Sequence, residues 1–441
     1  MTQSPETRSE PALAQEGMIT RFLRATEIDT RLLGMIGALV LIWVGFQIAG
    51  DLRNGNGVFL TPRNLWILLV QTASIAVMTT GMVMIIVMRH IDLSVGSLLA
   101  FVAVVMGYSQ VYILGPWLGV GHPAIWILSV IIGLCTGALI GAFHGYLISY
   151  AGIPSFIVTL GGLIVWRGAA WAVIRGETVA PMDERFELMG GGPFYASIGA
   201  TATWIIGILI CVLILLGIRS GRSARNKFRF PQRPIWAEAF LVAMGFALTI
   251  GTVLLVNSYY FPPKLAADYA ALHNIPVPEG GLLISRGFAI PVLIAAVVGL
   301  GMTFIATRTQ FGRYIYAIGG NPEAAELAGV NTRKITLLMF TLMGVLAAIS
   351  ACISSARLNA ASNALGLFDE LYVIAATVIG GTSLAGGVGT IYGAMLGALV
   401  MQSLQSGMTL LNFDSAYKDM AVGSVLVFAV WLDQIYRRRA N

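Results

Sequence analysis

Long apolar runs recur along this whole sequence, and they constrain its fold more than any other feature. Twelve are present, near residues 32–50, 65–88, 93–114, 124–149, 153–174, 204–218, 236–256, 288–306, 336–353, 370–384, 388–411 and 419–436. About 20 apolar residues carry an α-helix across a bilayer, whereas barrel strands show short alternating patterns instead. The runs therefore predict an all-α polytopic membrane protein, a helical bundle of about 10–12 transmembrane helices.

Composition agrees with a membrane bundle. Hydrophobic residues make up 57% of the chain and charged residues only 11%, which is outside the range of ordinary soluble domains. The 51 glycines suit membrane helices whose backbones approach closely. The three cysteines lie inside apolar runs without partners at metal-ligand spacing, so we expect core residues and no metal site. The net charge of +6 does not indicate nucleic acid, because the basic residues flank apolar runs.

The distribution of basic residues predicts the topology. With a cytoplasmic N-terminus, 18 of the 27 basic residues fall in inside segments, including the run at 219–233. This bias follows the positive-inside rule and places both termini in the cytoplasm. We divide the chain into a cytoplasmic tail with an interfacial helix (1–31), a transmembrane domain (32–436) and a basic cytoplasmic tail (437–441).

A short polar segment at 316–336, YAIGGNPEAAELAGVNTRKIT, interrupts the apolar pattern. Asn321 can cap a helix that begins with Pro322 and Glu323, since this position suits a capping side chain, a residue without N–H and an acid. Gly329 is a plausible stop. The expected helix has about two turns, which is too short to cross a bilayer, so we predict that it is presented on the cytoplasmic face.

A weak internal repeat links residues 84–105 with 375–396. Both stretches have an apolar lead, a polar break, a step of Ser and Leu, a glycine at the turn and an apolar continuation. Matching interruptions in two halves point to broken helices and to a transport pathway at the centre of a bundle.

The first break contains IDLSVGS, which places Asp92 and Ser94 beside a membrane segment. A carboxylate there needs water, a partner such as Arg89 or His90, or a helix to cap. We expect Asp92 to cap the next helix, and a role in substrate passage or gating is the alternative. A proton relay would require several intramembrane acids, and the apolar runs offer almost none.

Two series of glycines recur every four residues and form smooth helix faces. We expect close helix packing at these positions, and a pore lined by exposed backbone is the alternative. The series are Gly133, Gly137, Gly141 and Gly145, followed later in the chain by Gly389, Gly393 and Gly397. His144 lies beside the first series, where a hydrogen-bonded core histidine is expected.

Polar residues near the predicted outer surface are further candidates for a pathway. Trp166 and Arg167 end one apolar run, and Asn359 and Asn363 lie between two others. Arg167 can extend to the membrane interface or, with Trp166, line an outer vestibule. For the two asparagines, a solvated loop and a pathway lining are both open.

The chain lacks the motifs of an enzyme that hydrolyses ATP. No G-x-x-x-x-G-K-[ST] phosphate loop is present, and the glycines at 386–390 lie between apolar helices without the strand that a nucleotide turn requires. No HExxH or paired aspartate motif indicates another membrane enzyme, and we identify no catalytic residue.

The 316–336 segment resembles the cytoplasmic coupling segment of permease subunits in bacterial ATP-binding-cassette importers for monosaccharides. IDLSVGS, the run at 154–173 and VIGGTSLAGGVGTIYGAMLGALV at 378–400 are similar to that family's motifs, over most of 32–436. HIDLS and LQSGMTLL (404–411) look closest to xylose-type permeases. The sequence departs from the family in a longer 219–260 segment and in Met88-Arg89, which replace small residues.

The resemblance implies an inner-membrane transport subunit that moves a monosaccharide such as xylose by alternating access. It implies a second permease copy, a periplasmic sugar-binding protein and cytoplasmic ATPase subunits, which hold the ATP and Mg²⁺ while this chain binds no cofactor. The residues that carry over to the ATPase-docking surface are Asn321, Pro322, Glu323, Ala324, Ala325 and Gly329. Another small polar solute, such as a branched-chain amino acid, and an ion-coupled carrier remain alternatives.

Overall fold

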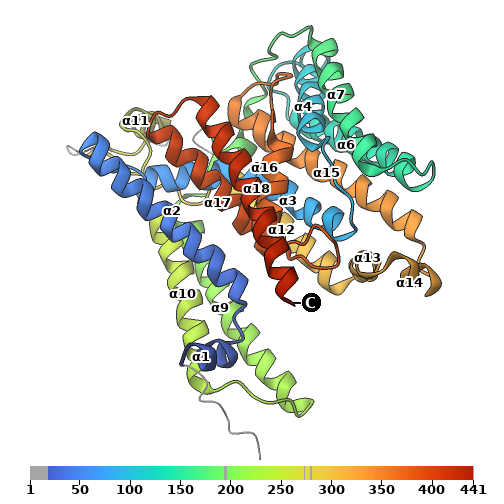
Figure 1. Cartoon of the computed structure of the whole chain (residues 1–441). Coiled ribbons are helices and arrows are strands. Elements are labelled where there is room, and N and C mark those ends of the chain that lie inside the picture. The colour runs from blue at the N-terminus through green and yellow to red at the C-terminus, as the bar shows by residue number, and fades with distance from the viewer. Residues whose placement is uncertain (1–17, 193–195, 273, 279–280, 441) are drawn as a thin grey trace, which may run out of the picture. The chain divides into compact units, whose positions relative to one another are not determined.

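The computed structural model describes residues 18–192, 196–272, 274–278 and 281–440, and the predicted tail at 1–17 lies outside them. Contacts divide the chain into two units, which are described separately: Met1–Gly34 with Ile206–Thr252, and Met35–Ile205 with Val253–Asn441. The larger unit contains most of the helices (Figure 1). In the described part of the chain the backbone is helical, with three isolated β-bridges and no strand.

The helices follow the apolar runs. In chain order they are α1 (Met18–Thr26), α2 (Thr30–Asn54), α3 (Pro62–Val87), α4 (Val95–Tyr108), a π-helical turn (Ser109–Leu114), α5 (Gly115–Leu118), α6 (Ala124–Ser149), α7 (Ser155–Ile174), α8 (Glu184–Glu187), a 3₁₀ turn (Leu188–Gly190), α9 (Gly199–Lys227), α10 (Ile235–Asn257), α11 (Pro263–Leu272), α12 (Ile290–Arg308), α13 (Gln310–Gly320), α14 (Pro322–Leu327), α15 (Thr332–Leu358), α16 (Asp369–Ile379), α17 (Ile391–Leu410) and α18 (Ser415–Ala440).

Nine of the described helices are long and apolar enough to cross a membrane. Three of the twelve predicted runs fall outside this set, and they correspond to α16, α17 and α18. Helix α16 has only 11 residues and is too short to cross a bilayer unaided. The glycine-rich stretch at 380–390 ends it, which is the break that the sequence predicts there. The chain is thus an all-α polytopic membrane protein.

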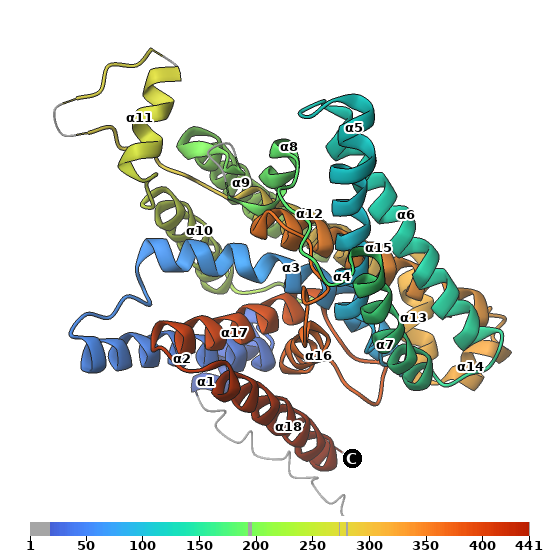
Figure 2. The same cartoon turned by 90° about the horizontal axis from the view of Figure 1, so that it is seen from above.

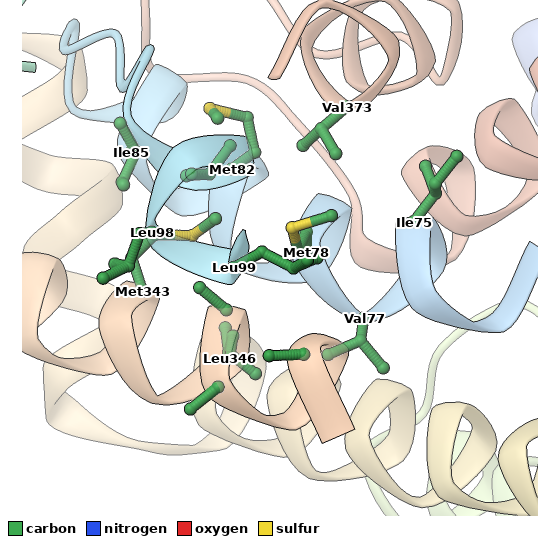
Figure 3. Close-up of a cluster of buried hydrophobic side chains, with 14 of the residues drawn as sticks. Ile75, Val77, Met78, Met82, Ile85, Leu98, Leu99, Met343, Leu346 and Val373 are labelled. Carbon is green, nitrogen blue, oxygen red and sulfur yellow. The ribbon is translucent and has the colours of Figure 1, made fainter. Parts of the chain in front are cut away.

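Helix α3 lies at the centre of the larger unit, and 94% of its most apolar window is buried by the rest of the chain. Thr61 caps its first turn by accepting a hydrogen bond from the Asn64 N–H. Figure 3 shows Met82, Leu98 and Met343 gathered between α3, α4 and α15. Because lipid tails are as apolar as these side chains, van der Waals packing rather than the hydrophobic effect favours their contact.

Three glycines of the α6 series, Gly137, Gly141 and Gly145, face α15, whereas Gly133 faces Met106 and Val102 of α4. A Cβ added at Gly137 would meet the Gly344 carbonyl, and one added at Gly141 would meet the Phe340 carbonyl. In the second series, Gly393 and Gly397 behave in the same way, since their Cβ atoms would meet the carbonyls of Gly380 and Ala376. Gly389 precedes α17, so its predicted place on that helix face is wrong, and its Cβ would meet the Thr382 and Val87 side chains. Small residues therefore bring backbones into direct contact at both places.

In the smaller unit, α1 lies against the α9–α10 hairpin. Phe22 stacks on Trp236 at 5.9 Å between ring centroids. Glu27 accepts hydrogen bonds from Arg225 at 2.8 Å and Arg233 at 2.7 Å. These bonds lower the pKa of Glu27 from 4.5 to about 2, because the two guanidinium groups stabilise its charged form.

We predict that Glu27→Gln loosens α1 at pH 7. The folded pKa is below the ordinary value, so the attraction is present above pH 4.5 and is lost as the pH falls towards 2. Because the carboxylate is 43% exposed, water screens the pair. We expect amide exchange in α1, relative to its intrinsic rate, to rise at most about fivefold. Glu326→Gln, at an exposed site in the other unit, is the control, and equal exchange in wild type and Glu27→Gln contradicts the prediction.

Candidate functional site

A polar cavity of about 430 Å³ lies between α3, α15, α16 and α17. Its volume is within the range of roughly 300–1,000 Å³ that small-molecule sites occupy. Amides and hydroxyls dominate the lining, together with one cation and one carboxylate. The lining residues are Asn64, Ile67, Gln71, Ser74, Ile75, Ser354, Arg357, Asp369, Gln402, Gln405, Ser406, Thr409 and Leu410.

Side-chain hydrogen bonds join α3 to α17 along the cavity wall. Gln402 donates to the Gln71 Oε1 at 3.2 Å, and the Ser406 hydroxyl donates to the Asn64 Oδ1 at 3.2 Å. The two helices run side by side in the larger unit (Figure 2). These neutral groups offer both donors and acceptors, so they can exchange their mutual bonds for bonds to a bound polar molecule.

A second cavity of about 380 Å³ shares Ser354, Arg357 and Asp369 with the first. The loop at 359–368 forms most of its remaining wall. Arg167 fixes this loop, because its guanidinium donates to the carbonyls of Asn363 and Leu365, both at 2.7 Å, and of Gly366 at 3.2 Å. Arg167 therefore positions the loop at 359–368.

Asn359 and Asn363 do not line either cavity among the described residues. Asn359 has a left-handed backbone (φ +50°) at the end of α15, and its Oδ1 accepts a hydrogen bond from the Met182 N–H at 2.6 Å. Asn363 contributes its carbonyl to Arg167. Their participation in a pathway stays a prediction.

Residues 88–94 form the non-helical break between α3 and α4. Asp92 and Ser94 of this break are buried inside the bundle. The expected capping role of Asp92 is wrong. Helix α4 begins at Val95 with Ser94 at the N-cap, and the Asp92 Oδ1 instead accepts bonds from the Ser94 N–H at 2.8 Å and hydroxyl at 2.6 Å. The segment between the helices is longer than the pattern indicated, which moves the carboxylate away from the first turn.

Ser94 and Trp166 meet through His144. The Trp166 indole N–H lies 2.9 Å from His144 Nε2, and the Ser94 hydroxyl lies 3.4 Å from Nδ1. An indole nitrogen can only donate, so Nε2 accepts and we assign the proton of the neutral ring to Nδ1. The hydrogen bonds then run in one direction, from Trp166 through His144 and Ser94 to Asp92, which ties α7, α6 and the break together.

Glu370 lies at the start of α16 near this network. The residue is 6% exposed, and its Oε2 has no hydrogen-bond partner among the described groups. A Cβ at Gly96 would meet this oxygen and the Gly366 carbonyl, so α4 and α16 begin close together. Broken helices that begin inside a membrane bundle are typical of transport pathways.

The 316–336 segment forms the end of α13, all of α14 and the start of α15, and these three helices lie together (Figure 1). The Asn321 side chain accepts from the Ala324 N–H at 3.0 Å, and Gly329 follows α14 with φ +84°, which confirms the predicted cap and stop. Glu323 is exposed. Ala325 differs from the expectation of an external surface, because it is 5% exposed and belongs to the main hydrophobic cluster.

The cavity and α14 are associated with opposite ends of the same helices. From Gln71 to the end of α3 at Val87 are 16 residues, or about 24 Å of helix. Helix α17 begins at Ile391 on the α13 side and reaches the cavity at Gln402, about 17 Å further on. A molecule in the cavity would thus lie far from α14.

No group of three or more described His, Cys, Asp or Glu side chains has the arrangement of a metal site.

Over 406 residues the chain is 36% identical to the xylose transport system permease protein of Escherichia coli, and the match covers 92% of both chains. The chain belongs to the permease family of bacterial ATP-binding-cassette sugar importers. It is therefore a multi-pass transport subunit rather than an enzyme.

Further comparisons extend across this permease. A model of the permease component of branched-chain amino acid transport systems matches residues 233–430. The ribose import permease protein of Escherichia coli is 29% identical, over 90% of this permease and 92% of the relative. The L-arabinose permease protein of Azospirillum brasilense is 28% identical, over 86% and 82%. No solved structure matches at a significant level.

Sequence reasoning missed the amides of the cavity. Gln71 and Gln402 lie among other polar residues on α3 and α17, and the occurrence of amides and hydroxyls on both helices was the available signal. It also missed Leu327, which is 91% exposed at the end of α14.

We predict that Asp92→Ala lowers the unfolding temperature of the permease. The change leaves the buried Ser94 N–H and hydroxyl without their acceptor, a loss of about 1–3 kcal/mol. Asp92→Asn keeps an acceptor oxygen and should lose less. Thermal unfolding in detergent measures both, with Asp268→Ala at an exposed position as the control. Equal unfolding temperatures of the Ala and Asn variants would show that the carboxylate oxygen is not the stabilising group.

Proposed function

We propose that this permease provides the membrane pathway through which an ATP-driven importer moves a pentose such as xylose. The observation that carries the proposal is the cavity walled by amides and hydroxyls. A neutral sugar presents many hydroxyls and no charge, so its binding requires donors and acceptors rather than ion pairs. The identity to the xylose permease over 92% of the chain supports the choice of sugar.

The cavity is the entry side of the proposed pathway. If α14 faces the cytoplasm, the cavity opens from the outer half of the membrane, since α3 and α17 separate it from α13 by their length. A periplasmic binding protein would release sugar there. The loop held by Arg167 lies at this end of the molecule and gives the binding protein a rigid surface.

Helix α14 is the proposed docking element for a cytoplasmic ATPase. It exposes Leu327 and Glu323 on a short helix whose start is fixed by Asn321. Each chain contributes one such helix, so we propose that two permease copies engage two ATPase subunits, which bind the ATP and Mg²⁺. The ATPases close on ATP and move α14, and the pathway then opens to the other side.

We predict that Leu327→Asp and Glu323→Arg abolish association with the ATPase. The first introduces a charge into the proposed apolar contact, and the second reverses the charge beside it. Copurification of the coexpressed ATPase is the measurement, with unfolding temperature as a check of the fold. Glu177→Arg, a charge reversal at an exposed loop position, is the control. Retention of the ATPase by both variants would contradict the docking assignment.

We predict ATP-dependent uptake of xylose by proteoliposomes that contain the permease, its ATPase and its binding protein. Gln402→Leu should lower uptake about tenfold, because a sugar hydroxyl then loses a buried partner. Gln232→Leu, in an exposed loop, should leave uptake unchanged. Ribose, galactose and leucine are compared in the same assay. A preference for leucine would assign the pathway to amino acids, and uptake driven by an ion gradient without ATPase would overturn the proposal.

A further inference from the structure

We propose that Arg89 is a positioning residue that transmits movement of the docking segment, α13 and α14, to α3 and α17, two of the four helices that wall the cavity. The inference rests on the proposed docking of an ATPase at α14. Arg89 lies just after α3, and it contacts the end of α13, which directly precedes α14.

The Arg89 side chain holds the C-terminal end of α13. Its Nε donates to the Gly319 carbonyl at 2.9 Å, and its Nη2 donates to the Gly320 carbonyl at 2.8 Å. The last carbonyls of a helix have no partners in the helix and carry a partial negative charge. A planar guanidinium can bind two of them at once, which fixes orientation as well as distance.

The backbone of Arg89 indicates that this side chain is specifically required. The Arg89 N–H bonds to the Ile86 carbonyl at 2.9 Å and the His90 N–H bonds to the Ile85 carbonyl at 3.0 Å, as at a helix end where glycine usually follows. Arg89 has φ +65°, a left-handed conformation that strains a residue with a side chain. Glycine would remove the strain but also the contact with α13.

The second break of the internal repeat meets the same point. The Gly387 N–H donates to the Val87 carbonyl at 2.9 Å, and the Tyr316 hydroxyl of α13 donates to the Gly389 carbonyl at 2.8 Å. Gly319 packs so closely that a Cβ would meet the Val87 carbonyl. The end of α3, the end of α13 and the loop before α17 thus form one hydrogen-bonded joint.

The joint lies at the end of α3 and just before the start of α17, the two cavity helices that it connects to α13. Helix α3 carries Gln71 and α17 carries Gln402, and these two amides bond to each other along the cavity wall. A helix transmits displacement along its length because its backbone hydrogen bonds are continuous. A shift of α13 would therefore move both helices, and Arg89 is the side chain that ties α13 to the first of them.

The test compares Arg89→Gly with wild type in the reconstituted importer. Glycine relieves the strain at the left-handed position, which offsets the two lost hydrogen bonds, so we expect an unfolding temperature close to that of wild type and unchanged ATPase association. We expect sugar uptake per ATP hydrolysed to fall at least about fivefold, the lower range of coupling between distant sites. Arg313→Ala removes an exposed charge from α13 and is the matched control, with uptake at the wild-type level.

Arg89→Lys tests whether the planar pair of donors is needed, because lysine keeps the positive charge and can still donate a hydrogen bond. An ammonium group can donate to a carbonyl but lacks the planar fork, so we expect uptake above that of Arg89→Gly and below wild type. Equal uptake by the Lys and Gly variants would overturn the hydrogen-bonded transmission. A loss smaller than about fivefold in Arg89→Gly would also overturn it.

Two further results count against the inference. Lost ATPase association in Arg89→Gly would show that Arg89 shapes the docking surface, and a lowered unfolding temperature would show a role in the fold alone. Absence of ATP-driven uptake in the wild type would overturn the proposed function itself. Because the wild type is measured in the same assay, the two failures are distinguishable.

Discussion

The need to pair every backbone polar group within the protein governs this structure. Hydrocarbon offers no hydrogen bonds, so a helix can stop inside a membrane bundle only where other groups satisfy its freed N–H and C=O groups. Helices α3 and α16 both end in such breaks. Asp92 satisfies the backbone of Ser94 in the first, and the Val87 carbonyl accepts from Gly387 in the second. The polar residues of the family motifs follow from this requirement.

Much of the fold was predictable from local sequence. Apolar runs predicted the helices, and the caps at Asn321 and the stop at Gly329 were predictable because their partners lie within four residues. The length of the break between α3 and α4 was not predictable, and for this reason the prediction that Asp92 caps α4 was wrong. Run length also counted α16 among the crossings, although the structure gives it only 11 residues.

The candidate site was less predictable because it depends on contacts between distant parts of the chain. Gln71 and Gln402 are 331 positions apart, and nothing local distinguishes them from polar residues that a membrane helix tolerates. The burial of Ala325 could not be predicted from the local sequence either, because its neighbours along the chain are exposed. The sequence suggested Arg89 only as a partner of Asp92 and as a departure from the family pattern, and the carbonyls that it does bind carry no sequence signal.

The backbone contact between α6 and α15 restricts how such a protein can move. At Gly137 and Gly141 the two helices touch through carbonyl groups with no flexible side chains between them, so they cannot slide or rotate without collision. We therefore expect α6 and α15 to move together. Across the cavity, the amides and hydroxyls of α3 and α17 can instead trade partners with water or with a solute at little cost. We therefore expect the polar contact between α3 and α17, rather than the glycine contact between α6 and α15, to be the one that opens when a solute passes.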